Sequence, residues 1–143
     1  MIRYVDTSVF VPFFVREPVS ASVELWFERT GVDGLALSSW TVTEFVSAIG
    51  SKVRARALSG TKGTAVVRQF HVLARQSLTL IAPTPEDFDS AARLMERFDL
   101  GLRAGDALHA AMARNADAAL LVTLDKVLAG AAGKIGLDCE VPA

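Results

Sequence analysis

Short apolar runs alternate with longer amphipathic segments along this chain, and that alternation restricts the fold more than any other feature. Four runs are too short for helices, bounded by polar or turn residues, and typical of buried strands: 2–5, 35–38, 78–81 and 119–122. The segments between them carry apolar residues at helical spacing. Strands alternating with helices predict an α/β fold, with a mostly parallel sheet covered by helices on both faces.

The expected helices follow from this spacing and from Gly and Pro at the segment ends. Pro18 fits the first turn of one helix, whereas Ser59 to Gly63 is expected to break the chain. The expected helices are 7–14, 18–29, 41–55, 65–76, 86–98 and 106–113, and 137–141 is expected to be a last edge strand. No long linker or repeat divides the 143 residues, so we expect a single domain over 1–143.

Charge and cysteine content narrow the classes of partner and compartment. The formal net charge is −1, so any contact with nucleic acid must depend on a local basic patch. Cys139 is the only cysteine, which excludes an internal disulfide and a thiolate metal cluster. The apolar run Val9–Val15 is interrupted by Pro12 and is too short to span a bilayer. We therefore expect a cytoplasmic protein with no membrane partner.

Four carboxylates fall where strands and helices of the expected sheet meet. Asp6 directly follows the first strand, and Asp125 follows the 119–122 strand. Glu44 lies in the first turn of the expected helix 41–55, and Asp106 opens the alanine-rich helix. In open α/β sheets, sites form at the carboxyl ends of the strands, so all four are candidate site residues.

Each of these acids also has a purely structural interpretation, which is the better one when the residue is taken alone. Asp6 and Asp106 are suitable helix N-caps, and Asp125 is an ordinary turn residue. Thr41 to Glu44 matches a capping box. Caps should scatter over both edges of the sheet, however, whereas these four acids share one edge in the expected topology.

Such a cluster is costly without a cation. Two carboxylates about 5 Å apart repel by roughly 3 kcal/mol at an effective dielectric near 20. Several such pairs would offset much of a domain's stability, which is typically about 5–15 kcal/mol. A cluster of this kind persists when its oxygens bind a hard divalent ion such as Mg²⁺ or Mn²⁺.

Four short motifs contain these acids: Val5–Ser8, Thr43–Phe45, Gly105–Ala111 and Val122–Asp125. In order and spacing they resemble the acidic motifs of PIN-domain nucleases. The chain is most similar to the VapC-type toxins of bacterial and archaeal toxin–antitoxin pairs, and the likeness covers nearly its whole length.

The resemblance implies an α/β/α sandwich, an endoribonuclease activity that depends on Mg²⁺ or Mn²⁺, a cognate antitoxin that blocks it, and a homodimer. It assigns catalytic roles to four acids and the metal to three of them, Asp6, Asp106 and Asp125. Supporting roles fall on two hydroxyl residues, which as bare sequence are local cap or turn hydroxyls. The catalytic acids are Asp6, Glu44, Asp106 and Asp125, and the supporting residues are Ser8 and Thr123.

The expected chemistry is attack on a phosphodiester by a water that the metal activates, with Glu44 helping to orient it. The ribose 2′-OH need not take part, so the expected products carry a 5′-phosphate and a 3′-hydroxyl. One rival is a phosphotransfer module, but Asp6-Thr7-Ser8 lacks the paired acids that such modules place at the first strand. A second rival is a non-catalytic PIN-like module that binds RNA or protein.

Two histidines and a basic stretch are further candidates for functional residues. His109 lies one helical turn after Asp106 and shares its face; a partly buried helix histidine is the first interpretation, and an approach to phosphate is the second. His71 has no ligand-type neighbours and receives no role. Lys52, Arg54 and Arg56 form either a solvated helix face or an RNA backbone contact.

Overall fold

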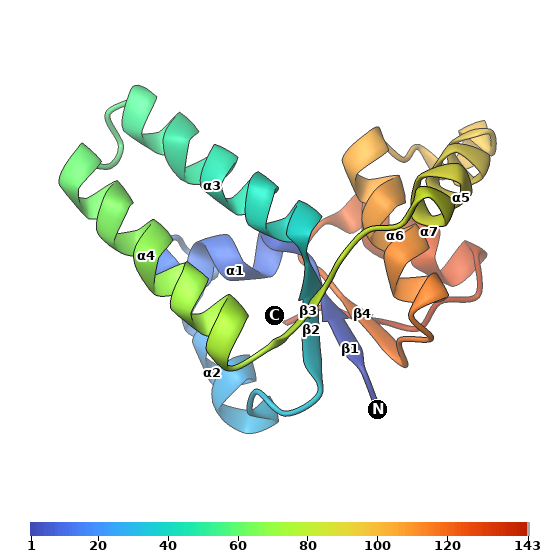
Figure 1. Cartoon of the computed structure of the whole chain (residues 1–143), viewed down its shortest axis with the longest axis horizontal. Coiled ribbons are helices and arrows are strands. Elements are labelled where there is room, and N and C mark those ends of the chain that lie inside the picture. Colours follow the sequence, from blue (N-terminus) through green and yellow to red (C-terminus); the bar gives the residue numbers. More distant parts are fainter. Residues whose placement is uncertain (143) are drawn as a thin grey trace.

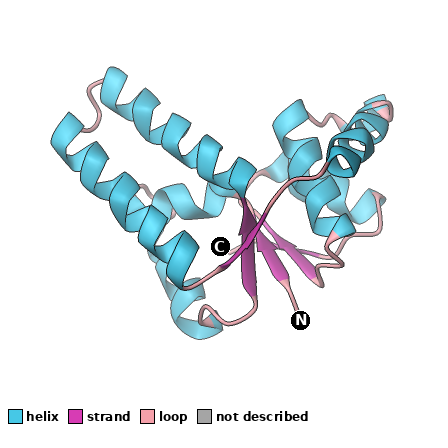
Figure 2. Cartoon of the chain, in the orientation of Figure 1, coloured by secondary structure: helices cyan, strands magenta, loops and turns pink. Residues whose placement is uncertain are grey.

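The computed structural model describes residues 1–142 and is built on one five-stranded sheet (Figures 1 and 2). The strand order is β3-β2-β1-β4-β5, and every neighbouring pair is parallel. The predicted mostly parallel sheet is therefore confirmed. The strands are β1 (Arg3–Val5), β2 (Leu35–Ser38), β3 (Thr79–Ile81), β4 (Leu120–Val122) and β5 (Cys139–Glu140).

Helices cover both faces of this sheet and give the expected α/β/α sandwich. Figure 1 shows α1–α4 on one side and α5–α7 on the other. The helices are α1 (Thr7–Phe14), α2 (Ser20–Thr30), α3 (Ser39–Arg54), α4 (Gly60–Gln76), α5 (Pro85–Met95), α6 (Ala104–Asn115) and α7 (Lys126–Lys134), with a 3₁₀ turn, η1 (Phe98–Leu100), before α6.

Two apolar cores lie on the two faces of β1, because successive side chains of a strand point in opposite directions. Val5 belongs to the core under α1–α4, where Phe45 stacks on Phe70 with ring centroids 3.9 Å apart. Tyr4 belongs to the core under α5–α7, where it meets the buried alanine face of α6. Tyr4 and Val5 of the central strand are thus completely buried, and the residue that follows them is held between two packed layers.

Side-chain caps account for most differences between the predicted and observed helix starts. Ser38 caps α3 by accepting a bond from the Thr41 amide, so this helix begins at Ser39 and not at Thr41. Ser59 accepts a bond from the Lys62 amide and starts α4 at Gly60, inside the segment that we expected to break the chain. A Ser in this position satisfies an otherwise unpaired amide, which outweighs the low helix propensity of the glycines nearby.

The C-terminal half shows two further differences. The predicted helix 86–98 ends at Met95, and Phe98 belongs to a separate 3₁₀ turn. Helix α7 was not predicted at all, because Gly130 and Gly133 interrupt a short alanine-rich segment. No helix within residues 1–142 has the length and apolar character needed to cross a membrane.

Candidate active site

The four predicted acids come together at the carboxyl edge of the sheet, around a hollow of about 500 Å³. Asp6 lies buried directly after β1, and its amide donates to the Val122 carbonyl of neighbouring β4 (2.9 Å). The other three acids are half-buried and line the hollow itself. Its lining is Trp40, Glu44, Gly101, Arg103, Gly105, Asp106, Asp125 and Val127.

Three of these acids influence one another electrostatically. Burial raises the pKa of Asp106, and the negative charges of Asp125 and Asp6 raise it further. A bond to the Arg103 backbone and the nearby His109 act in the opposite direction without cancelling this effect. Protons or cations are therefore favoured in the hollow.

Asp6 does not serve as a helix cap. It occupies the N-cap position of α1, but its side chain makes no capping bond, so that alternative is wrong. Its Oδ2 atom instead accepts bonds from Ser8 Oγ (2.7 Å) and Thr123 Oγ1 (2.8 Å). Its Oδ1 atom lies 3.2 Å from His109 Nε2. The carboxylate is fixed from three directions.

Ser8 and Thr123 connect this carboxylate to the backbone at the end of β4. Ser8 Oγ accepts a bond from the Leu124 amide (2.9 Å), and Thr123 Oγ1 accepts one from the Asp125 amide (2.9 Å). The two hydroxyls thus hold Asp6 and the loop carrying Asp125 in one arrangement. Bare sequence allowed each a local cap or turn role, and the resemblance a bond to a carboxylate of the site. In the structure both bond to Asp6, and the Thr123–Asp6 and Leu124–Ser8 bonds join segments more than 100 residues apart.

Thr123→Val is expected to weaken Mn²⁺ binding about tenfold, the lower end of the range for groups that orient a metal ligand. Valine keeps the shape of threonine but cannot donate to Asp6 Oδ2, so the carboxylate gains freedom. Isothermal titration with Mn²⁺ measures the effect. Thr43→Val, at an exposed position on α3, is the control and should bind Mn²⁺ as the parent does. Equal affinity for Thr123→Val and the parent would contradict this role.

Glu44 is not part of a capping box either. The box of α3 is formed by Ser38 and Thr41, and Glu44 lies in the second helical turn. Its Oε1 atom accepts a bond from Thr7 Oγ1 (2.6 Å) and contacts His109 Nε2. Burial alone would raise the pKa of Glu44, but the His109 and Thr7 bonds lower it below its usual range.

Asp106 and Asp125 differ in how the fold uses them. Arg103 occupies the N-cap position of α6, so Asp106 lies in the first turn and is not the cap. Asp125 does cap a helix: its Oδ1 atom accepts bonds from the Val127 (2.8 Å) and Leu128 (3.0 Å) amides of α7. Both bonds use Oδ1, so capping and a role for Oδ2 in the hollow are compatible.

His109 was a candidate without an assigned site role, and the structure gives it closer contact with the acids than the sequence predicted. It was expected to be partly buried, but it is completely buried and contacts two of the four acids. Burial lowers the pKa of His109, yet the bond to Glu44 and the surrounding carboxylates outweigh this and raise it. The available signal was its position one turn after Asp106 on the same helix face.

The donor set fits a hard divalent cation. Single ligand atoms of Asp6, Glu44 and His109 lie within 4.8 Å of one another, and Asp106 and Asp125 line the adjoining hollow. The group is rich in carboxylate oxygen, which Mg²⁺ and Mn²⁺ prefer. Of the predicted metal ligands, Asp6 belongs to this close group, whereas Asp106 and Asp125 line the adjoining hollow; Glu44 and His109 are more tightly associated with Asp6 than expected.

The predicted basic stretch is only partly available for RNA. Lys52 is paired with Glu17 (2.9 Å), and Arg54 donates to Ser51 of its own helix. The structure places both near the C-terminal end of α3, beyond Glu44. Arg103, in contrast, lines the acidic hollow directly.

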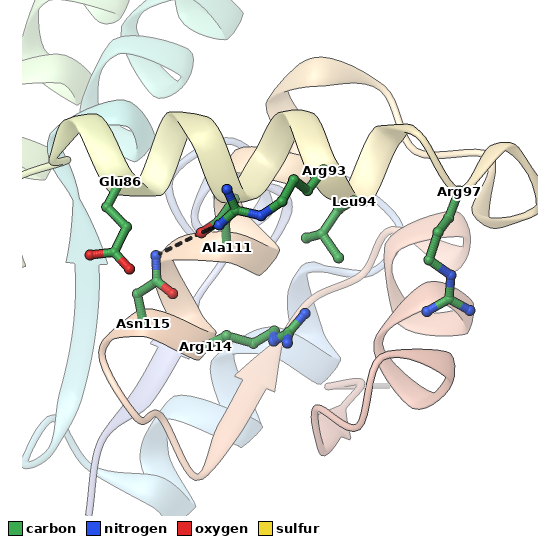
Figure 3. Close-up of a pocket in the computed structure, with 8 residues that line it drawn as sticks. Glu86, Arg93, Leu94, Arg97, Ala111, Arg114 and Asn115 are labelled. Carbon is green, nitrogen blue, oxygen red and sulfur yellow. Dashed lines mark hydrogen bonds between the residues drawn. The ribbon is translucent and has the colours of Figure 1, made fainter.

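A second hollow of about 410 Å³ lies between α5 and α6 (Figure 3). Arg93, Arg97 and Arg114 line it together with Asn115, which donates to Ser90 Oγ (3.4 Å). Arg114 lies two turns beyond Asp106, about 12 Å along the helix axis. The arginine-lined hollow is therefore separate from the acidic one.

Known proteins agree with this architecture. Three solved structures superpose on the chain: FitAcB from Neisseria gonorrhoeae (TM-score 0.72, 19% identity, 99% of this chain and 98% of that chain); VapBC2 from Rickettsia felis bound to a promoter DNA fragment (0.71, 18%, 99% and 98%); and VapC20 from Mycobacterium tuberculosis, a sarcin–ricin loop cleaving toxin (0.73, 14%, 90% and 94%). At these identities they show a shared fold. A search among curated protein sequences finds no match.

A sequence model of one family covers nearly the whole chain. The PIN domain model matches residues 3–134, a range that contains every acid of the hollow. The expectation from the motifs is thereby confirmed: this chain belongs to the PIN domain family.

Proposed function

We propose that the protein is a Mg²⁺- or Mn²⁺-dependent endoribonuclease and the toxin half of a toxin–antitoxin pair. The observation that carries this proposal is the meeting of Glu44, Asp106 and Asp125 around one open hollow in a PIN domain, with the buried Asp6 carboxylate close to them. Acids that share a hollow at the carboxyl edge of a parallel sheet are suited to hold a cation beside a phosphodiester.

The structural neighbours support the toxin part of the proposal. One of them is a toxin that cleaves the sarcin–ricin loop, and another was solved as a VapBC2 assembly on promoter DNA. By analogy we propose a cognate antitoxin as partner, a homodimer as the toxin's own assembly, and the cytoplasm as its location. An antitoxin arginine placed among the carboxylates would supply the positive charge that the cation otherwise brings.

Each residue of the site has its own role in this proposal. Asp6, Asp106 and Asp125 hold the cation, and Glu44 orients the attacking water through its second oxygen. When bound, the divalent ion supplies positive charge to the scissile phosphate and lowers the pKa of that water. Ser8 and Thr123 keep Asp6 in place.

Two donors of the hollow are suited to the substrate. Arg103 lines it and can pair with a phosphate oxygen. Trp40 Nε1 is buried there and has no hydrogen-bond partner within residues 1–142. A buried donor without a partner is costly, and a phosphate or ribose oxygen of bound RNA would satisfy it.

Cleavage of total RNA with Mg²⁺ or Mn²⁺ is expected to give fragments with a 5′-phosphate and a 3′-hydroxyl, and EDTA should abolish it. The reason is that the attacking group is water, so the 2′-OH is not consumed. Ligation-based mapping of the ends measures this directly. A 2′,3′-cyclic phosphate would contradict the mechanism, because it requires attack by the ribose.

The alternative is a PIN-like module that binds RNA or protein without cleaving it. Titration of the free protein with Mn²⁺ separates the two. The enzyme is expected to bind Mn²⁺ in the hollow and to lose binding when Asp106 is replaced by Asn. Absence of Mn²⁺ binding by the folded parent would favour the inert module.

A further inference from the structure

A continuous chain of buried hydrogen bonds runs from the sheet to the acidic site through His109. Tyr4 Oη donates to Ser38 Oγ (2.8 Å), and Ser38 Oγ accepts a bond from the Thr41 amide (3.1 Å). Tyr4 Oη also lies 2.8 Å from His109 Nδ1. The Tyr4, Ser38, Thr41 and His109 side chains are all fully buried, so solvent does not compete for these bonds.

The donor and acceptor roles of His109 follow from its partners. Because the Tyr4 hydroxyl proton is directed to Ser38, its oxygen accepts a bond from Nδ1–H. On the other side, Nε2 faces Glu44 Oε1 and Asp6 Oδ1, and ionised carboxylates can only accept. The ring is therefore held on one side by Tyr4, and on the other its Nε2–H donates to Glu44 Oε1, with Asp6 Oδ1 in ion-pair contact at 3.2 Å.

These bonds determine which carboxylate oxygens remain available. Glu44 Oε1 is occupied by both Thr7 and His109, which leaves Oε2. Asp6 Oδ2 is occupied by two hydroxyls, which leaves the remaining lone pair of Oδ1. Each carboxylate oxygen accepts about two bonds, so Glu44 keeps Oε2 and Asp6 keeps one acceptor site of Oδ1 for a further partner.

We propose that His109 is a positioning residue that fixes Glu44 and Asp6 relative to each other and is itself fixed by Tyr4. The contact joins three elements of distant sequence: His109 on α6, Glu44 on α3 and Asp6 after β1. This inference rests on the proposed function insofar as the two acids serve a cation. His109 is not itself a ligand, because both of its nitrogens are already bonded and hard cations prefer oxygen.

Two substitutions separate positioning from packing. His109→Gln can place an amide donor near the Nε2 position, whereas His109→Asn reaches only the Nδ1 position and cannot contact the acids. His109→Asn is expected to weaken Mn²⁺ binding about tenfold and to lower kcat more than it raises KM, as typical for groups that orient metal ligands. His109→Gln should recover most of both. Equal behaviour of the two folded variants would overturn the proposal, since a packing role does not distinguish them.

Tyr4→Phe keeps the tests informative if the His109 variants fold poorly. Phenylalanine preserves the ring in the core and removes only the oxygen that holds Nδ1. Mn²⁺ binding is expected to weaken less than in His109→Asn but in the same direction, while an affinity equal to that of the parent would overturn the role of Tyr4.

The hydrogen bonds themselves are measurable by ¹⁵N-histidine NMR, independently of any RNA cleavage. The chain has two histidines, so the spectrum of His71→Gln assigns the His109 ring. We expect protected protons on both ring nitrogens, with the Nδ1 signal changed in Tyr4→Phe and the Nε2 proton retained under saturating Mg²⁺. Loss of the Nε2 proton on Mg²⁺ addition would make His109 a ligand and overturn the proposal. Failure of the proposed function would instead appear as RNA left intact by a parent protein that binds Mn²⁺ and shows these bonds.

Discussion

Asp6→Asn is expected to reduce RNA cleavage about a thousandfold, equivalent to about 4 kcal/mol of lost transition-state stabilisation. Asparagine has the volume of aspartate, and its amide oxygen can still accept the Ser8 and Thr123 bonds. It carries no charge, and its amide nitrogen would face the His109 donor at the position of Oδ1. Single-turnover cleavage of labelled RNA, together with Mn²⁺ titration, measures both the chemical and the binding effect.

Stability is expected to change less than cleavage. The Asp6 charge contributes to raising the pKa of Asp106, so removing it relieves a repulsion in the folded state. The same substitution removes the ion-pair contact with buried His109 and turns an amide donor toward it, so we expect a melting temperature at or below that of the parent. Asp87→Asn is the matched control: Asp87 is equally buried, but it belongs to the capping box of α5, where its Oδ2 accepts a bond from the amide of the N-cap residue Thr84. That variant should lose about 1 kcal/mol of stability and cleave normally. Cleavage by Asp6→Asn at the parent rate would remove Asp6 from the mechanism.

The layered fold could be predicted because its determinants are local. The runs at 2–5, 35–38 and 119–122 are too short and apolar for anything but buried strands, and helices between them force parallel pairing. The shared edge of the acids followed from this topology alone. Helix starts were less predictable, because a side-chain cap such as Ser59 depends on a single bond that overrides the glycines after it.

The hydrogen-bond partners of the acids in the site could not be predicted for a different reason. The partners of Asp6 and Glu44 are side chains from other elements of the fold, here Thr123 after β4 and His109 on α6. Sequence spacing placed His109 on the face of Asp106 but could not show that this face packs against Tyr4. The capping interpretations of Asp6 and Glu44 failed for the same reason: long-range bonds to these carboxylates replaced the expected local ones.

Gly105→Ala is expected to lower Mn²⁺ affinity and RNA cleavage by up to about 100-fold, the upper end for changes beside a metal ligand. A Cβ atom at Gly105 would lie 2.9 Å from Glu44 Oε2 and 3.4 Å from the Trp40 ring. Glu44 cannot simply swing away, because its Oε1 atom is held by Thr7 and His109. The methyl group therefore disturbs the one oxygen of Glu44 that the hydrogen bonds leave available.

Helix propensity makes this substitution unusually diagnostic. Alanine in a helix is normally more stable than glycine by about 0.5–1 kcal/mol, and Gly105 lies in the first turn of α6. Gly130→Ala on α7 is the control, because a Cβ atom there meets nothing within 4 Å; it should raise stability by this amount and leave cleavage unchanged. Gly105→Ala should show less of that gain, or none, together with the loss of activity. The contrary result is a Gly105→Ala variant that gains the full stability and cleaves RNA at the parent rate. Glu44 Oε2 would then have no part in binding the cation or orienting the water. The positioning role proposed for His109 would lose its functional purpose.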